Sequence, residues 1–206
     1  MKDIDVLLSL DDLIGKAESD GKDASLLKAF HASIYLSMQF QEELEVISNL
    51  FNREKNNDAA GRMLVRTLSA EFEAKLYLLQ QLLLHVSLNK DHAPTLHEIA
   101  ILNGESVYIK NNGAIGVSKK FYPFLDNLIF TLRLAQRSFG EHVYCDTAVA
   151  GWKDVKIFID VRNRITHPKL SDDLHITDQE VDSLNRAQDW LRLAFGSVFS
   201  GYPTEA

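Results

Sequence analysis

The sequence predicts an all-α protein, a four- to five-helix up-and-down bundle that carries a small β-hairpin. Three observations predict it: two long segments with apolar residues at helical spacing, an Asn-Gly pair between short β-prone runs, and a capping-box sequence ahead of the last helical stretch. The chain has 206 residues, of which 46% are hydrophobic, enough to bury a substantial core. We therefore expect one domain over residues 1–206, with the hairpin as an insertion around 105–120.

The first two helices are expected to form an antiparallel pair. In residues 25–51 the apolar side chains recur three, four or six positions apart: Leu27, Phe30, Ile34, Met38, Leu44, Ile47 and Phe51. From Arg62 to about Leu88 a second stripe follows: Leu64, Leu68, Phe72, Leu76, Leu79, Leu83 and Val86. Only a short polar stretch separates the two, which favours antiparallel neighbours.

The later elements have distinct start and stop signals. Asn112-Gly113 supplies the positive φ angles of a tight hairpin turn. Pro123 fits the first turn of a helix that runs to about Phe139. A further helix is expected from Trp152 to about Thr166, because Pro168 disfavours helical geometry just before it. The last helix opens with the capping box Thr177–Glu180 and runs to about Phe199.

Charge and composition narrow the function classes. The formal net charge of −7 and the pI near 5.5 give no general basic surface for a polyanion, so any contact with nucleic acid must be local. Cys145 is the only cysteine, which fits a reducing compartment, and we expect it to be a small buried side chain. The N-terminal stretch lacks the features of a signal peptide, and the longest apolar run, Leu76–Val86, is too short to span a bilayer. These features predict a soluble, cytoplasmic protein with no membrane partner.

The segment "VRNRITHPK" carries the candidate chemistry. On a helical wheel, Arg162 falls within an apolar arc formed by Trp152, Val155, Phe158, Ile159, Val161 and Ile165. A guanidinium that is always charged must pair with an acid or open onto a cleft or a partner surface. Asn163 lies at the edge of the arc, and His167 follows it by four positions.

More ordinary interpretations exist for each of these residues. Arginines on helices commonly extend to solvent or pair with a carboxylate, and a histidine at a helix end commonly interacts with terminal carbonyls. The segment Glu71–Lys75 is typical of a solvated helix face, although an acid from that helix could also pair with Arg162.

The hexapeptide "RNRITH", Arg162–His167, resembles the R-x(4–6)-H motif of the HEPN superfamily, in the common form with Asn after Arg. HEPN domains are helical bundles that begin with a long helical hairpin and carry this motif late in the chain, as predicted here. The resemblance implies a metal-independent endoribonuclease from a toxin–antitoxin or phage-defence system. It also implies a homodimer in which two motifs face each other across a shared cleft. On this view, the apolar face around Arg162 would meet its twin.

The residue types suit that activity. RNA can be cut without metal when its 2′-hydroxyl attacks the adjacent phosphate, which needs proton transfer and stabilisation of the charged phosphorane. We expect Arg162 to clamp the phosphate, His167 to transfer protons and Asn163 to orient either His167 or the phosphate. Arg164 and Lys169 are expected to contact RNA, together with Lys119 and Lys120, although simple solvation is the ordinary role of surface lysines.

The expected partners are RNA, a second copy of the chain and an antitoxin protein. Some HEPN toxins carry a tyrosine two residues after the motif histidine, the target of a modifying antitoxin; here that position is Lys169, which argues against this route of inhibition. We expect no cofactor or metal, because the cluster Asp91, His92, His97 and Glu98 does not have a recognised zinc spacing. Two alternatives stay open: a catalytically inactive HEPN-like interaction or nucleotide-sensing module, and a helical scaffold in which Arg162 pairs with an internal acid.

Overall fold

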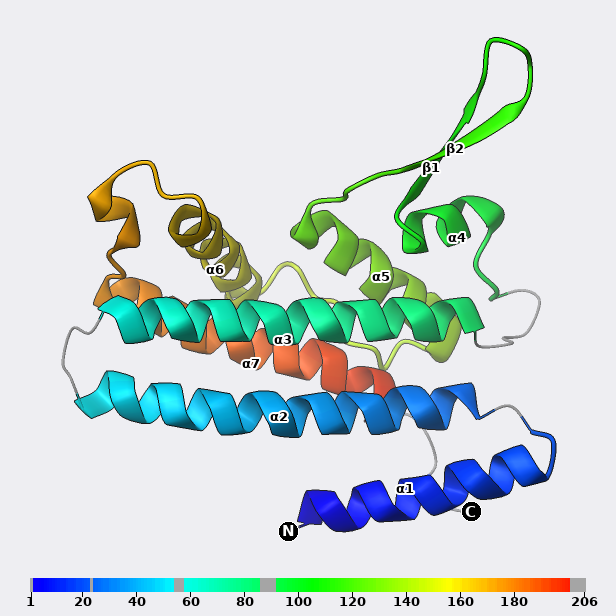
Figure 1. Cartoon of the computed structure of the whole chain (residues 1–206), viewed down its shortest axis with the longest axis horizontal. Coiled ribbons are helices and arrows are strands. Elements are labelled where there is room, and N and C mark those ends of the chain that lie inside the picture. The colour runs from blue at the N-terminus through cyan, green and yellow to red at the C-terminus, as the bar shows by residue number, and fades with distance from the viewer. Residues whose placement is uncertain (1, 23, 54–57, 86–91, 201–206) are drawn as a thin grey trace.

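The computed structural model describes residues 2–22, 24–53, 58–85 and 92–200. Within these ranges the chain forms seven α-helices, one short 3-10 helix and one two-stranded antiparallel sheet (Figure 1). The all-α class with a small hairpin is confirmed, but the count of four to five helices is wrong. None of the described helices is long and apolar enough to cross a membrane.

The two additional helices had weak sequence signals. Helix α1, Lys2–Ser19, packs against α2. Among its described side chains, at 8–19, Leu10 is buried while Leu8 and Leu13 are exposed, so the buried apolar stripe over these residues is narrow. Helix α4, Leu96–Leu102, has only seven residues, fewer than a periodic pattern needs. The sequence nevertheless contains a signal for the start of α4, because Thr95 and Glu98 have capping-box spacing, and in the structure both capping hydrogen bonds are present.

The predicted antiparallel pair is present as α2, Ser25–Arg53, and α3, Asp58–His85, which lie side by side (Figure 1). Helix α3 begins four residues before the expected start. The expected end of this helix near Leu88 lies outside the described residues. The capping box of the last helix is also confirmed: the Glu180 side chain accepts from the Thr177 backbone N–H at 2.9 Å, and Thr177 Oγ1 accepts from the Glu180 N–H at 3.3 Å.

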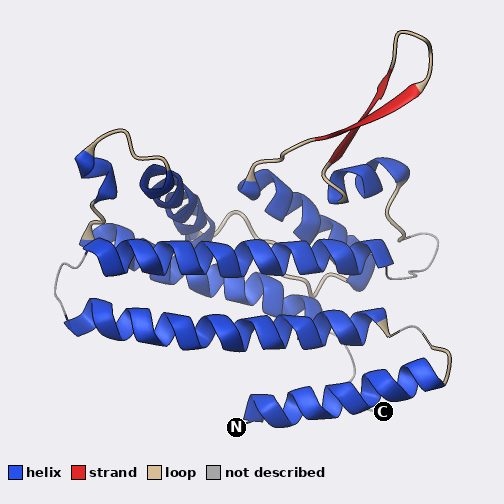
Figure 2. Ribbon diagram, viewed as in Figure 1, coloured by secondary structure: helices blue, strands red, loops and turns tan. Residues whose placement is uncertain are grey.

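The hairpin is confirmed as β1, Glu105–Ile109, paired with β2, Ile115–Lys119, with Val107 opposite Val117 (Figure 2). Its turn depends on the Asn-Gly pair. Gly113 has φ of 79°, and Asn112 Oδ1 accepts from the Ala114 N–H at 3.1 Å. The hairpin projects from the helical body beside α4 (Figure 1).

The remaining helices are α5, Phe124–Phe139, α6, Ala150–Thr166, and α7, Asp178–Ser200, with the 3-10 helix η1, Ser171–Leu174, between the last two. Pro123, expected in the first turn of α5, lies one residue before the helix begins, and its carbonyl accepts from the Asn127 N–H at 3.0 Å.

The core lies where α3, α6 and α7 meet. The Phe72 ring stacks on Phe195 with centroids 6.2 Å apart and meets the edge of Phe158 at 6.4 Å. The apolar residues of α6, including Val161 and Ile165, are buried in this core. The expectation that this face meets its twin is therefore wrong, because helices of the same chain already cover it. Cys145, expected to be buried, is half-buried, and this burial raises the pKa of its thiol.

Candidate functional site

Arg162 lies at the edge of the buried face of α6, with 30% of its side chain exposed. Its Nη2 donates to Glu73 Oε1 on α3 at 2.6 Å, and its Nη1 donates to Asn163 Oδ1 at 3.1 Å. The Glu73 side chain is 47% exposed, so the ion pair is at the surface and not deep within the chain. The structure thus brings Arg162 and Asn163 together and adds a carboxylate from the segment that the sequence offered as a pairing partner.

The rest of that segment differs from the expected solvated face. Glu71 and Lys75 are almost fully buried, with 4% and 10% of their side chains exposed, and Lys75 Nζ lies 2.6 Å from Glu71 Oε1. The Lys75 ammonium also lies 5.8 Å from the centre of the Phe72 ring. A buried ammonium requires a partner of opposite charge, and here the Glu71 carboxylate is that partner. Of the two acids in "EFEAK", only Glu73 is therefore available at the surface to Arg162.

Arg162 and Asn163 line a groove of about 520 Å³ between α3, α6 and the start of α5. We call it the Arg162 groove. Its wall is rich in aromatic side chains: Tyr77, Phe121, Tyr122 and Phe124. Its charged residues are three acids and one base: Glu73, Asp126, Asp160 and Arg162. In one subunit, the groove is therefore net negative, which opposes the binding of a phosphate anywhere except at Arg162 itself.

His167 is the C-cap of α6, and its side chain is exposed. Its backbone N–H donates to the Asn163 carbonyl at 3.0 Å, which holds it at the helix end. Within the described ranges, its imidazole makes no hydrogen bond or ion pair with the protein. The three motif residues thus share one end of α6, but the His167 ring is not hydrogen-bonded to Arg162 or Asn163.

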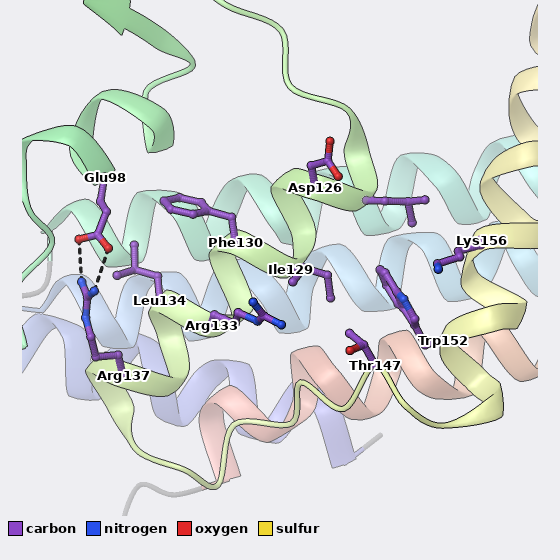
Figure 3. Close-up of a pocket in the computed structure, with 11 residues that line it drawn as sticks. Glu98, Asp126, Ile129, Phe130, Arg133, Leu134, Arg137, Thr147, Trp152 and Lys156 are labelled. Carbon is purple, nitrogen blue, oxygen red and sulfur yellow. Dashed lines mark hydrogen bonds and ion pairs between the residues drawn. The ribbon is translucent and has the colours of Figure 1, made fainter.

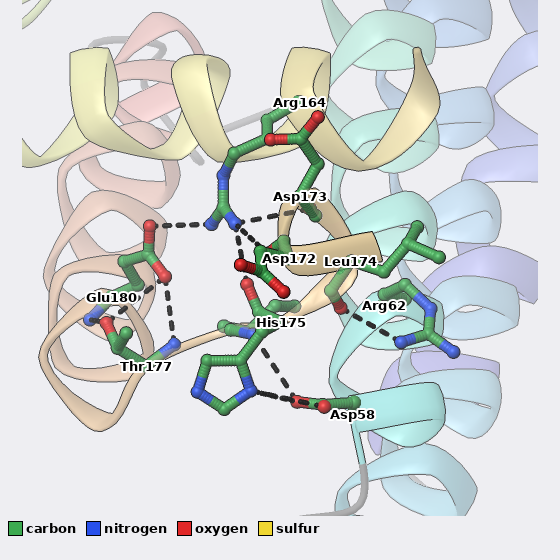
Figure 4. A network of polar contacts seen from close by, with 10 residues as sticks. Asp58, Arg62, Arg164, Asp172, Asp173, Leu174, His175, Thr177 and Glu180 are labelled. Atoms are coloured by element: carbon green, nitrogen blue, oxygen red, sulfur yellow. Dashed lines mark hydrogen bonds and ion pairs between the residues drawn. The ribbon is translucent and has the colours of Figure 1, made fainter. Parts of the chain in front are cut away.

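The Arg164 guanidinium points toward η1 and the start of α7 and is hydrogen-bonded within the chain (Figure 4). Its Nη1 donates to the backbone carbonyls of Asp173 at 3.2 Å and His175 at 2.6 Å, and its Nη2 donates to Glu180 Oε1 at 2.7 Å. These bonds join the end of α6 to η1 and to the first turn of α7. We therefore replace the expected RNA contact of Arg164 with a structural role.

The other contacts in this network hold the segment after the motif (Figure 4). His175 Nδ1 lies 3.0 Å from Asp58 Oδ1, and Arg62 donates to the Leu174 carbonyl at 2.9 Å. Hydrogen bonding to His175 lowers the pKa of Asp58. The segment between α6 and α7 is thus tied to α3.

Lys169 lies in the turn that follows Pro168, and its side chain is exposed. Asp173 fixes this turn: its Oδ2 accepts from the backbone N–H groups of Lys169 at 2.7 Å and Leu170 at 2.9 Å. These two bonds lower the pKa of Asp173. Of the two residues near the motif that the sequence suggested for RNA contact, Arg164 and Lys169, only Lys169 has an exposed side chain; Lys119 and Lys120, on the hairpin, are exposed as well.

A second cavity, of about 650 Å³, had no sequence prediction; we call it the α5 pocket (Figure 3). Arg133 and Lys156 point into it beside Trp152 and Phe130 (Figure 3). Among the described residues, no carboxylate lies within ion-pair distance of either cation. The sequence did contain a signal for this pocket. One face of α5 carries an aromatic ring and two arginines, spaced three and four residues apart: Phe130, Arg133 and Arg137.

The end of the α5 pocket is closed by an ion pair. Arg137 donates to both oxygens of Glu98 at 2.8 and 2.7 Å, and it lowers the pKa of Glu98 to about 2. Glu98 belonged to the metal cluster considered from sequence, and Asp91 of that cluster lies outside the described residues. Within the described part of the chain, no three His, Cys, Asp or Glu side chains are grouped so that they could hold a metal ion.

Comparisons of this chain with protein-family models, with curated proteins and with solved structures found no match.

Proposed function

We propose that this protein is a homodimeric, metal-independent endoribonuclease of the HEPN type, acting in a toxin–antitoxin or phage-defence system. One observation carries the proposal. Arg162 is held at the mouth of a groove by Glu73 and Asn163, while His167, at the same end of α6, presents an imidazole with no protein partner among the described residues. A phosphate clamp and an accessible proton-transfer group are the two elements that metal-free RNA cleavage needs.

In the proposed reaction, Arg162 binds two non-bridging oxygens of the scissile phosphate. His167 accepts the proton of the adjacent 2′-hydroxyl as its oxygen attacks phosphorus. The bond from phosphorus to O5′ then breaks, and the leaving oxygen takes a proton from His167 of the second subunit. The products are a 2′,3′-cyclic phosphate and a 5′-hydroxyl. Asn163 accepts a hydrogen bond from Arg162 and so orients the guanidinium.

The direct test is cleavage of a single-stranded RNA by the purified full chain in excess EDTA. We expect cleavage to persist, and the new 5′ ends to accept phosphate from polynucleotide kinase without prior dephosphorylation. Cleavage that requires an added divalent cation, or products with 5′-phosphate ends, would rule out this mechanism.

Glu73 gives the site a resident competitor for RNA. Its carboxylate occupies the Nη2 position that a phosphate oxygen would take, so RNA must displace it. Replacing Glu73 with Gln is expected to increase RNA affinity about fivefold, in line with the roughly 1 kcal/mol of an exposed ion pair. Fluorescence anisotropy would measure this in the His167→Ala background, where RNA stays intact.

Glu18→Gln is the matched control for that experiment, because it removes the same charge from an exposed ion pair between Glu18 on α1 and Lys28 on α2. If Glu73→Gln and Glu18→Gln change RNA affinity equally, Glu73 has no specific role at the site.

The α5 pocket favours a second candidate function, an inactive module that senses an anionic small molecule. Its volume suits a drug-sized ligand, and Arg133 and Lys156 could bind phosphate beside the Trp152 and Phe130 rings.

A nucleotide present at about a hundred times its dissociation constant should raise the melting temperature of the protein by about 5–10 °C. Arg133→Gln should abolish that shift, whereas the exposed control Arg192→Gln should retain it. A chain that cuts no RNA but shows this shift has the second function; a chain that shows no shift does not.

A further inference from the structure

One face of the hairpin is aliphatic and uncovered. The cross-strand pairs Val107–Val117 and Ile109–Ile115 lie on the same face, and these four side chains are 55–79% exposed. The opposite face is different, because the Tyr108 ring covers Gly116, where an added Cβ would lie only 2.6 Å from the ring. Contiguous exposed aliphatic surface on a projecting element is typical of a contact with another protein.

The hairpin is anchored at the rim of the Arg162 groove. The Tyr122 hydroxyl, from the groove wall, donates to the Glu105 carbonyl at 3.2 Å, and the Lys120 N–H donates to the Gly104 carbonyl at 2.9 Å. Phe121, between the hairpin and the groove, is 89% exposed. From this base the strands project away from the helices, so the aliphatic face does not cover the groove of its own chain (Figure 1).

The hairpin and the groove have opposite charge. Residues 105–120 contain one acid, Glu105, and three lysines, Lys110, Lys119 and Lys120. The groove has three acids and one arginine, and no ion pair occupies Asp126 or Asp160 among the described residues. Each surface also carries apolar side chains. Those on the hairpin are aliphatic, and those in the groove are largely aromatic.

We propose that the hairpin of each subunit lies in the Arg162 groove of a second copy of the chain. Each chain carries one hairpin and one groove, so a reciprocal exchange closes at a two-fold dimer. The aliphatic face would pack on the groove aromatics, and the net positive charge of the hairpin would be attracted by the net negative charge of the groove.

This exchange also alters the charge around Arg162. The partner's hairpin, with three lysines and one glutamate, would cancel the net negative charge of the groove, which has three acids and one arginine, and so would remove the repulsion that an RNA backbone meets in the single subunit. That consequence rests on the proposed function, whereas the exchange itself can be tested without RNA.

The first test is molar mass in solution, measured for the full chain by light scattering over a range of concentrations. We expect a dimer for the wild type. The double variant Ile109→Asp, Ile115→Asp should raise the dimer dissociation constant at least a hundredfold, because it places two carboxylates in an apolar contact next to acids. Val46→Asp, an equally drastic change at an exposed site on α2, should leave the dissociation constant unchanged. Circular dichroism checks that all three proteins are folded.

The second test reverses the charges. Lys110→Glu with Lys120→Glu should weaken the dimer about tenfold, and so should Asp126→Lys with Asp160→Lys. All four changes in one chain should restore the wild-type dissociation constant, since the complementarity returns. A monomeric wild type, a dimer that the aspartates leave intact, or a failure of the fourfold variant to restore affinity would each overturn the exchange. A dimer that behaves as expected but cuts no RNA would support the exchange and refute the ribonuclease.

Discussion

RNA cleavage is expected to fall by about 10²–10³-fold when Arg162 is replaced by alanine, the range found when a preorganised donor to a transition-state oxyanion is removed. The charge on the phosphorane exceeds the charge on the ground-state phosphate, so the loss should be mainly in kcat. Arg162→Lys should recover only part of the rate, because an ammonium keeps the charge but cannot donate two parallel hydrogen bonds. Single-turnover cleavage in EDTA measures the chemical step directly.

Two matched controls make this result specific. Arg192→Ala removes the same side chain from an exposed position on α7, and His97→Ala removes an exposed imidazole on α4. Both should cut RNA like the wild type, whereas His167→Ala should be impaired about as severely as Arg162→Ala. If Arg162→Ala and His167→Ala cut as fast as these controls, the motif is not the active site.

The free energy of unfolding is expected to fall by about 2–3 kcal/mol when Arg164 is replaced by alanine. The change leaves Glu180 without its ion-pair partner and removes donors from the Asp173 and His175 carbonyls. We place the loss below that of a fully buried pair because Arg164 and Glu180 keep 29% and 24% of their side chains exposed. Denaturant unfolding measures the loss, and the melting temperature should drop by about 5–10 °C.

The same variant separates a structural role from a role in RNA binding. At a temperature where Arg164→Ala remains folded, its affinity for RNA should equal that of the wild type. An Arg164→Ala protein of unchanged stability and weakened RNA binding would reverse our interpretation of this residue.

Lys169, in the adjacent turn, is exposed, so Lys169→Ala should show the opposite pattern. Its free energy of unfolding should equal that of the wild type, and its affinity for RNA should fall by the contribution of one phosphate contact.

Local sequence signals predicted the helices and turn that they govern. Apolar periodicity located α2 and α3, Asn112-Gly113 located the hairpin turn, and the capping box Thr177–Glu180 located the start of α7. Each signal acts within a few residues of the backbone that it shapes. Helix α1 was missed because, of its described side chains at 8–19, only Leu10 is buried, and its position depends on packing against α2.

By itself, the sequence determined that Arg162 and Asn163 would be neighbours at the end of a helix with His167 beyond them, since helical geometry fixes the relation of residues so close in the chain. Only the tertiary structure decided what surrounds them. It paired Arg162 with Glu73, 89 residues away, directed Arg164 to Glu180, and buried the apolar face of α6 under α3 and α7. The periodicity of a single helix gives the face on which a side chain lies, but the packing of distant helices sets which acid, cavity or partner that face meets.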